Sequence, residues 1–194
     1  MKFIKNKKGF TLVELVVGTA ILGVIGLTTA MLMTSGTNMY RGVHRRSTVL
    51  FKSQVAATQL SEAIVDCKYP FSVHEDTLFL GGVEDGDKKI DVYYFNEDEH
   101  TIYLRSDSIS STGSITQGEA VPFCYNVNDI SYEAFANTET GEAYALKFVL
   151  AIEKFGLNYP RNEVLSLRNH PTLVSGDSAA DTEQKLAEEM GALS

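Results

Sequence analysis

The sequence predicts an α+β protein in which one long N-terminal α-helix packs on an antiparallel β-sheet. Three observations favour this class. Residues 10–33 form one apolar run, residues 34–66 continue with helical periodicity, and from Cys67 onward the periodicity falls to two, the spacing of half-buried strands. Proline first appears at position 70, so we expect a single helix from about Phe10 to about Asp66.

The first half of this helix is long and apolar enough to cross the ~30 Å hydrocarbon core of a bilayer. Glu14 is the only charged residue between Gly9 and Arg41. A carboxylate costs on the order of 2–3 kcal/mol at the centre of a bilayer and less near its surface. The sequence therefore predicts that Glu14 has a partner.

The second half of the helix is amphipathic, which indicates that one side packs on a folded domain. We expect Leu50, Ala57, Leu60 and Ile64 to form the packed side. Between the two halves, residues 35–37 are serine, glycine and threonine, which are weak helix formers and predict a bend.

Alternating apolar residues predict the strands that follow. The strongest pattern puts Tyr144, Leu146, Phe148, Leu150 and Ile152 on one face, which should cover the amphipathic half of the helix. Acidic or glycine-containing turns join two pairs of these runs into hairpins. The predicted strands are residues 77–80, 90–95 paired with 101–105, 129–135 paired with 144–153, and 164–168.

Two segments lack a strand pattern. Residues 106–118 are predicted to be a surface loop. The acidic segment from Pro171 predicts either a short helix from Asp181 to Met190, capped weakly by Thr182, or disorder.

The charge of the chain is unevenly distributed. Lys2, Lys5, Lys7 and Lys8 precede the apolar run, so the remainder of a chain of net charge −8 stands at about −12. That acidic charge argues against bulk nucleic-acid binding. The lysines predict that the N-terminus stays in the cytoplasm and that the C-terminal domain lies outside it.

Residues 8–14 read Lys-Gly-Phe-Thr-Leu-Val-Glu, and this register resembles the class III signal of type IV pilins and type II secretion pseudopilins. The resemblance implies a pilin-like fold, cleavage by a prepilin peptidase between Gly9 and Phe10, and N-methylation of Phe10. It also implies that Glu14 pairs with the Phe10 amine of a neighbouring subunit during filament assembly. The implied partners are the peptidase, other pilin or pseudopilin subunits, an inner-membrane assembly platform and membrane lipid.

This resemblance divides the chain into four parts. They are a cleaved leader at residues 1–9, a transmembrane and assembly helix at 10–36, a pilin-like globular domain at 37–169, and an acidic C-terminal tail at 170–194. The expected location is a single-pass membrane protein with an extracytoplasmic C-terminal domain, which becomes part of a cell-surface or periplasmic filament.

The sequence contains two cysteines, Cys67 and Cys124. Outside the cytoplasm they can pair as a disulfide, and closing that loop contributes roughly 4 kcal/mol in the chain-entropy model. The alternative is two free, buried thiols.

The sequence carries no pattern typical of an enzyme, a metal site or a bound cofactor. Its four histidines are scattered. The acidic runs at residues 84–87 and 97–99 offer oxygens that calcium accepts, but neither has EF-hand spacing, so we interpret them as solvated turns with a calcium site as the alternative. Arg41, Arg45 and Arg46 form one basic cluster. We interpret it as a source of salt bridges between subunits, with DNA contact as the alternative.

The predicted function is therefore a structural subunit of a type IV pilus-like filament. Many major pilins carry a proline about twenty residues into the mature helix, and this chain has none around Met31. Residues 165–169 also resemble the ending of some minor pilins. We therefore expect a minor pilin or pseudopilin. The alternative is a single-pass extracellular binding protein or adhesin that does not polymerise.

Overall fold

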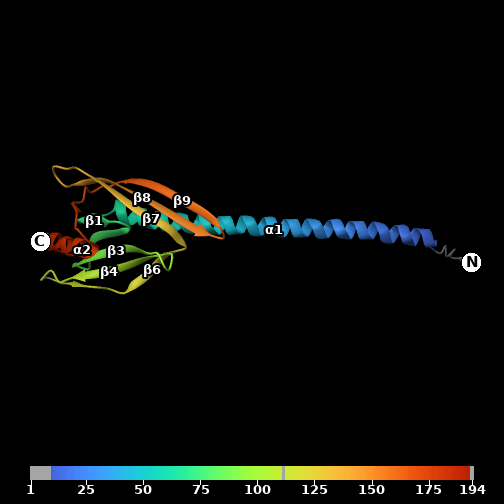
Figure 1. Ribbon diagram of the computed structural model, residues 1–194, viewed down its shortest axis with the longest axis horizontal. Helices are drawn as coiled ribbons and strands as arrows, with labels where there is room; N and C mark the ends of the chain where they lie inside the picture. The colour runs from blue at the N-terminus through green and yellow to red at the C-terminus, as the bar shows by residue number, and fades with distance from the viewer. Residues whose placement is uncertain (1–9, 111, 193–194) are drawn as a thin grey trace, which may run out of the picture. The chain divides into compact units, whose positions relative to one another are not determined.

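The computed structural model of the chain describes residues 10–110 and 112–192, with a long first helix, two β-sheets and a short last helix (Figure 1). The chain divides into two compact units, Met1–Arg46 and Ser47–Ser194. Helix α1 (Leu12–Val65) begins in the first unit and ends in the second. The predicted long helix and the α+β class are confirmed.

The part of α1 that lies in the first unit is helical throughout. The helix is thus unbroken at residues 35–37, where the sequence predicted a bend. A single glycine costs a helix only about 1 kcal/mol, and the two threonines around Gly36 bond within the helix. The Thr34 and Thr37 hydroxyls donate to the carbonyls of Ala30 and Thr34, at 2.8 and 2.9 Å.

The part of α1 that lies in the second unit buries one stripe of side chains. Val49 is 1% exposed and Leu50 is 49% exposed, so the predicted position of Leu50 in the packed side is wrong. Each residue turns the helix by 100°, which puts Val49 within the buried stripe and Leu50 just outside its edge. The buried residues are Val49, Ser53, Ala56, Ala57, Leu60 and Ile64.

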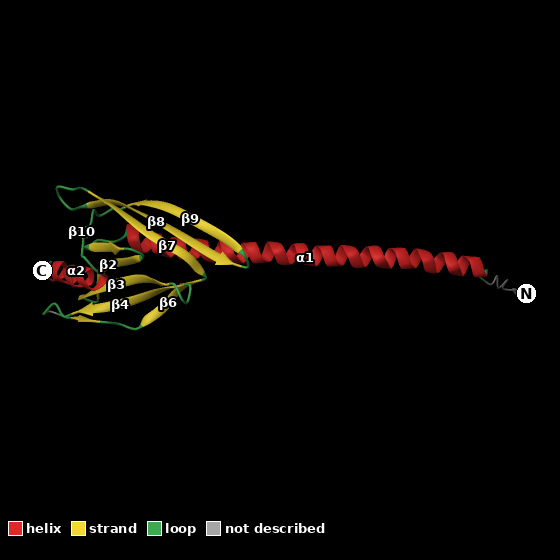
Figure 2. Cartoon of the chain, in the orientation of Figure 1, coloured by secondary structure: helices red, strands yellow, loops and turns green. Residues whose placement is uncertain are grey.

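The larger sheet has seven strands, drawn in yellow with the smaller sheet in Figure 2. Its order is β10-β1-β2-β3-β4-β5, and β6 pairs with β4 beside β5. The strand predicted at 77–80 and the hairpin of 90–95 with 101–105 are confirmed as β2 and as β3 with β4. The bounds are β1 (Phe71–His74), β2 (Thr77–Glu84), β3 (Asp87–Asn96), β4 (Thr101–Ile109), β5 (Ile115–Thr116), β6 (Ala120–Tyr125) and β10 (Leu173–Val174).

The smaller sheet has the order β7-β8-β9, and its strands are β7 (Val127–Ala136), β8 (Ala143–Lys154) and β9 (Leu157–Ser166). The second predicted hairpin is confirmed as β7 with β8. The last strand was predicted at 164–168, but β9 begins seven residues earlier and ends at Ser166. It contains Pro160, which an edge strand tolerates because one of its sides needs no hydrogen bonds.

The main core joins the buried stripe of α1 to both sheets. From β8 it takes Leu146, Phe148, Leu150 and Ile152, as the alternating pattern predicts. Tyr144 is the exception, because it is 50% exposed and lies at the start of the strand.

A second core lies on the opposite face of the larger sheet. In β2, Leu78 and Leu80 belong to the main core while Phe79 belongs to the second, as strand alternation requires. Helix α2 (Ala179–Ala192), red in Figure 1, covers this face with Leu186, Ala187 and Met190. The larger sheet is thus packed between α1 and α2.

Helix α2 confirms the helix predicted from Asp181 to Met190, and the alternative of disorder is wrong. Its cap is Ser178, whose hydroxyl accepts a hydrogen bond from the Asp181 amide at 3.2 Å. Thr182, the predicted cap, is instead buried, and its hydroxyl has no hydrogen-bond partner among the described residues.

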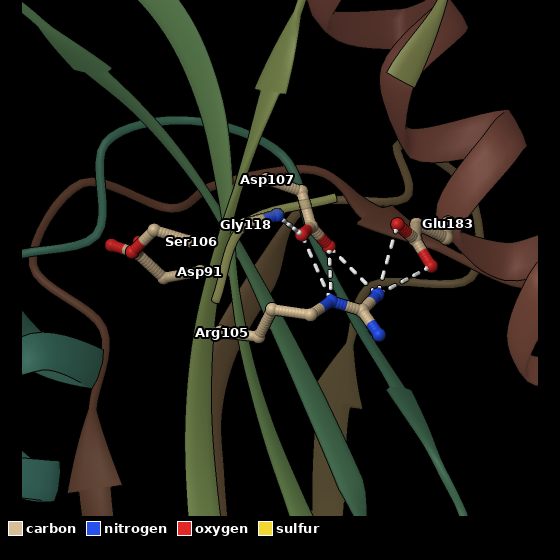
Figure 3. A network of polar contacts seen from close by, with 6 residues as sticks. All are labelled: Asp91, Arg105, Ser106, Asp107, Gly118 and Glu183. Atoms are coloured by element: carbon tan, nitrogen blue, oxygen red, sulfur yellow. Dashed lines mark hydrogen bonds and ion pairs between the residues drawn. The ribbon is translucent and has the colours of Figure 1, made fainter. Parts of the chain in front are cut away.

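A buried charge cluster fastens α2 to the sheet (Figure 3). The Arg105 guanidinium on β4 donates from Nε to both oxygens of Asp107 at 2.8 Å, and from Nη2 to both oxygens of Glu183 on α2 at 3.1 and 3.2 Å. The amide of Gly118 also donates to Asp107 at 2.8 Å. Burial raises the pKa of Glu183, the Asp107 carboxyl raises it further, and Arg105 opposes both.

Candidate assembly site at the start of α1

The first turn of α1 holds the candidate site. Thr11 is the residue before the helix, and the Glu14 carboxylate reaches back to it. Glu14 Oε2 accepts hydrogen bonds from the Thr11 amide at 3.0 Å and from the Thr11 hydroxyl at 2.9 Å. The Glu14 amide donates to Thr11 Oγ1 at 3.3 Å. This reciprocal arrangement is a capping box, which satisfies amides that a helix start leaves open.

The capping box changes the interpretation of Glu14 from sequence. Thr11 was not among the predicted site residues, although its spacing, threonine followed three residues later by glutamate, is a known signature of a helix start. Thr11 therefore supplies two donors to the carboxylate within one copy of the chain. Both donors go to Oε2, and Oε1 has no hydrogen-bond partner among the described residues. Since a carboxylate oxygen has two lone pairs, Glu14 keeps room for another donor.

Phe10 precedes this turn and is 85% exposed. Gly9 and the rest of the predicted leader lie outside the described residues. Of the two residues at the predicted cleavage position, the structure therefore describes Phe10.

The helix that follows the site has a surface suited to lipid. Within α1, an 18-residue window has a mean hydropathy of 2.2 and no buried residues, and its length and composition suffice to cross a membrane. Polar side chains there are satisfied within the helix. The hydroxyls of Thr19, Thr28 and Thr29 donate to carbonyls three or four residues earlier, at 2.8–3.0 Å.

Cys67 and Cys124 are both buried and free in the structure, which corresponds to the alternative of two thiols. Burial raises the pKa of each thiol to about 11. Cys67 donates a hydrogen bond to the Tyr69 carbonyl at 3.2 Å, while Cys124 lies in β6.

The acidic run at residues 84–87 forms the turn between β2 and β3. Asp85 and Gly86 have positive φ angles of 52° and 92°, and Lys89 pairs with Glu84 at 2.9 Å. The described residues contain no group of three or more histidine, cysteine or acidic side chains placed to hold a metal ion.

The other predicted groups are spread over both units. Arg41, Arg45 and Arg46 lie in the part of α1 that belongs to the first unit, and His44 stacks on Tyr40. His100 lies in the β3–β4 turn, where its Nδ1 is 3.2 Å from the Val127 carbonyl.

The comparison with protein families agrees with the geometry of this site. The family model described as "prokaryotic N-terminal methylation motif" matches residues 4–30, which include Gly9, Phe10 and Glu14. The match supports the type IV pilin and pseudopilin family and a pilin-like or pseudopilin-like precursor. No curated protein matches the chain.

The motif implies processing by a prepilin peptidase and assembly with other pilin subunits. Together with the apolar helix it supports anchoring in a membrane and a place in a surface pilus. It points to a structural protein and not to an enzyme.

Proposed function

We propose that this chain is a minor pilin or minor pseudopilin, a structural subunit of a type IV pilus-like filament. Prepilin peptidase cuts it after Gly9, Phe10 is N-methylated, and the subunits assemble through α1. One observation carries the proposal, namely that Glu14 of the matched motif lies in the first turn of a helix whose apolar side chains are exposed, with Phe10 just before that turn.

Glu14 acts in this proposal as the charge partner of a neighbouring subunit. Cleavage leaves an ammonium group on Phe10, which can approach Oε1 of Glu14 from the next copy. Two such charges ~4 Å apart attract by about 4 kcal/mol at an effective dielectric of 20, before desolvation is subtracted. The Thr11 donors lower the cost of the carboxylate in a single subunit but bring no positive charge, so the docked pair remains favoured.

The proposed topology follows from the lysines before the helix, which remain cytoplasmic while the unit Ser47–Ser194 lies outside the membrane. Prepilin peptidase and an inner-membrane assembly platform act on the subunit before it joins the filament. We assign the basic cluster Arg41, Arg45 and Arg46 to salt bridges between subunits, because the acidic net charge of the rest of the chain disfavours contact with DNA.

Two variants of Glu14 separate its charge from its role in the helix cap. Glutamine also forms capping boxes, so Glu14→Gln keeps an acceptor for Thr11 and removes the negative charge, whereas Glu14→Ala removes both. We expect both variants to insert in the membrane and both to be incorporated into filaments at least tenfold less than the native chain. Filaments sheared from cells and quantified by immunoblot give the measurement.

Normal incorporation of Glu14→Gln would contradict the charge pairing and leave only the cap. N-terminal sequencing of the mature chain tests the class itself, since the proposal requires a start at methylated Phe10. An intact Met1, or a cut near Ser35, would favour the single-pass binding protein or adhesin that does not polymerise.

A further inference from the structure

A polar pocket of about 370 Å³ lies in the unit Ser47–Ser194, where three turns of the chain meet. They are the β3–β4 turn, the junction of β6 with β7, and the β8–β9 hairpin loop. Two backbone hydrogen bonds join these turns. The Val127 amide donates to the His100 carbonyl at 2.9 Å, and the Glu153 amide donates to the Asn126 carbonyl at 2.8 Å. The pocket is therefore preorganised by backbone of both sheets, and its volume is typical of small-ligand sites.

Unfavourable backbone conformations are concentrated around this pocket. Among the described residues, six that are not glycine have a positive φ angle. Three of these six line the pocket, namely His100, Asn126 and Phe155, with φ angles of 49°, 63° and 58°. Residues held in such conformations cluster at ligand sites, where the surrounding structure maintains the strain.

Phe155 is the least expected of the three. Phe155 and Gly156 form the two-residue loop between β8 and β9, and both have positive φ, as in a type I′ turn. The first position of that turn favours asparagine, aspartate or glycine, and the β2–β3 turn of this chain has Asp85 there. A bulky residue is unfavourable at this position. The Phe155 side chain is also 54% exposed, so neither the turn nor the core explains a phenylalanine here.

The polar side chains of the pocket suit an uncharged molecule with many hydroxyl groups. The amides of Asn126 and Asn128 both donate and accept hydrogen bonds, while Glu153 accepts and Lys154 donates. Because the carboxylate and the ammonium group offset each other, the pocket favours neither an anion nor a cation. The Lys154 ammonium lies 5.5 Å from the centroid of the Phe155 ring, so a donor and an apolar surface stand side by side.

We propose that this pocket binds the ring of an uncharged sugar. The apolar face of the sugar ring lies on Phe155, and its hydroxyl groups bond to Asn126, Asn128 and Glu153. The inference goes beyond the proposed function, because it concerns what the displayed domain recognises and not how the subunit assembles. Cell-wall glycan strands and the glycans of other surfaces both present uncharged sugar rings, and the choice of probes separates these two sources.

Saturation-transfer NMR of the full chain tests the binding. The chain is held in lauryldimethylamine oxide, a detergent without a sugar head group, and the probes are N-acetylglucosamine, typical of cell walls, and galactose, typical of other surface glycans. Glucosamine and glucuronate serve as charged controls. We expect transfer to the ring C–H protons of at least one uncharged sugar, and at least threefold less transfer to both charged ones. No transfer to either uncharged sugar, or equal transfer to the charged ones, would overturn the proposal.

The variant Phe155→Asn separates binding from folding. Asparagine suits the first position of the turn, so we expect a higher urea midpoint of unfolding together with at least tenfold less saturation transfer. Tyr144→Asn changes another half-exposed aromatic residue, on β8 but outside the pocket, and should keep the native transfer. If Phe155→Asn lowers the midpoint, or keeps the native transfer, the ring serves the fold and the proposal is overturned.

A second variant tests the amides. Asn126→Gly keeps a residue that tolerates the positive φ angle and removes the side-chain amide, so saturation transfer should fall at least threefold without loss of the folded state. Native transfer in this variant would contradict the role of Asn126.

The proposed function has separate readouts, a start at Phe10 and incorporation into sheared filaments. If both are normal and no uncharged sugar gives a signal, the pocket proposal is overturned and the proposed function stands. If the chain binds sugar but does not start at Phe10, the proposed function fails and the pocket proposal stands.

Discussion

The two compact units of this chain rely on different surroundings. In Met1–Arg46, the large apolar side chains of α1 are exposed, and the hydroxyls of Thr19, Thr28 and Thr29 donate to carbonyls of the same helix. In Ser47–Ser194, the same helix contributes a buried stripe to a core shared with two sheets. One helix thus combines a half that needs lipid or neighbouring subunits with a half that needs only its own domain.

The charges divide in the same way. The first unit is cationic and has Glu14 as its only acid, while the second unit is strongly acidic. Substitutions in the two halves of α1 therefore need different assays. Changes in the first unit should alter assembly, and changes in the second should alter folding.

The largest expected difference between the two units is in the effect of replacing a leucine of α1 by alanine. Leu60→Ala should lower the free energy of unfolding of the second unit by about 3 kcal/mol, because Leu60 is fully buried in the main core. Leu22→Ala, in the exposed part of α1, should leave it unchanged. Urea unfolding of the detergent-solubilised full chain, followed by near-ultraviolet circular dichroism of its tyrosines, gives both values. Equal losses would contradict the separation of the units.

Replacing a glycine by alanine should also have different effects in the two units. A Cβ added at Gly81 would lie 2.5 Å from the Pro70 carbonyl oxygen and 2.8 Å from Met190 Sδ on α2. Gly81→Ala should therefore destabilise the second unit by about 1–3 kcal/mol and loosen α2. At Gly23 a Cβ meets nothing within 4 Å. Gly23→Ala should leave the unfolding curve of the second unit in place, and a shift there would link the two units.

The cluster around Arg105 predicts a pH effect confined to the second unit. Glu183 has an ordinary pKa of 4.5, which the folded chain raises mainly by burial. Above pH 4.5 the folded state holds this proton more tightly than the unfolded state, so the contribution of Glu183 to stability falls as the pH rises through that window. The protection of α2 amides from hydrogen exchange, corrected for intrinsic rates, should fall likewise.

The substitution Glu183→Gln should flatten this pH dependence, because it removes the titrating group. Glu189→Gln, at an exposed position of the same helix, serves as the control and should retain the native profile. An unchanged slope in Glu183→Gln would show that other groups control the docking of α2.

Two serines of α1 give the smallest effects. The Ser53 hydroxyl is buried without a hydrogen-bond partner among the described residues, so Ser53→Ala should stabilise the second unit by about 1 kcal/mol. The Ser61 hydroxyl donates to Glu163 at 2.9 Å and to the Ala57 carbonyl at 2.7 Å. Ser61→Ala should destabilise by about 0.5–1 kcal/mol. Shifts of the same sign in urea unfolding would contradict these assignments.

Hydrophobic periodicity in the sequence predicted the long helix and the long strands, in which the pattern repeats several times. Helix α1 and the hairpins β3–β4 and β7–β8 are long, and each buries one side, so periodicity was informative. Strand β10 spans two residues, and the residues of β6 do not alternate between apolar and polar, so periodicity indicates neither strand. Strand β9 was predicted too short because Pro160 is acceptable only at a sheet edge, and edges are not visible in a sequence.

The candidate site at the start of α1 could be predicted from adjacent residues, whereas the charge cluster around Arg105 could not. Phe10 and Glu14 were found because their motif is contiguous, and the spacing of Thr11 and Glu14 contained the capping box as well. Arg105 and Glu183 are 78 residues apart, and only the packing of α2 on the sheet brings them together. No local pattern indicates such a pair.

The threonines of the first unit have a consequence for how a subunit could leave a membrane. Because Thr28 and Thr29 donate to Val24 and Ile25 of the same helix, their hydroxyls need no solvent and no neighbour. A change of surroundings from acyl chains to other protein helices would therefore break none of these bonds. Between Thr11 and Tyr40 the only charged side chain is that of Glu14, so the Glu14 carboxylate is the side chain whose electrostatic energy depends on this change of surroundings.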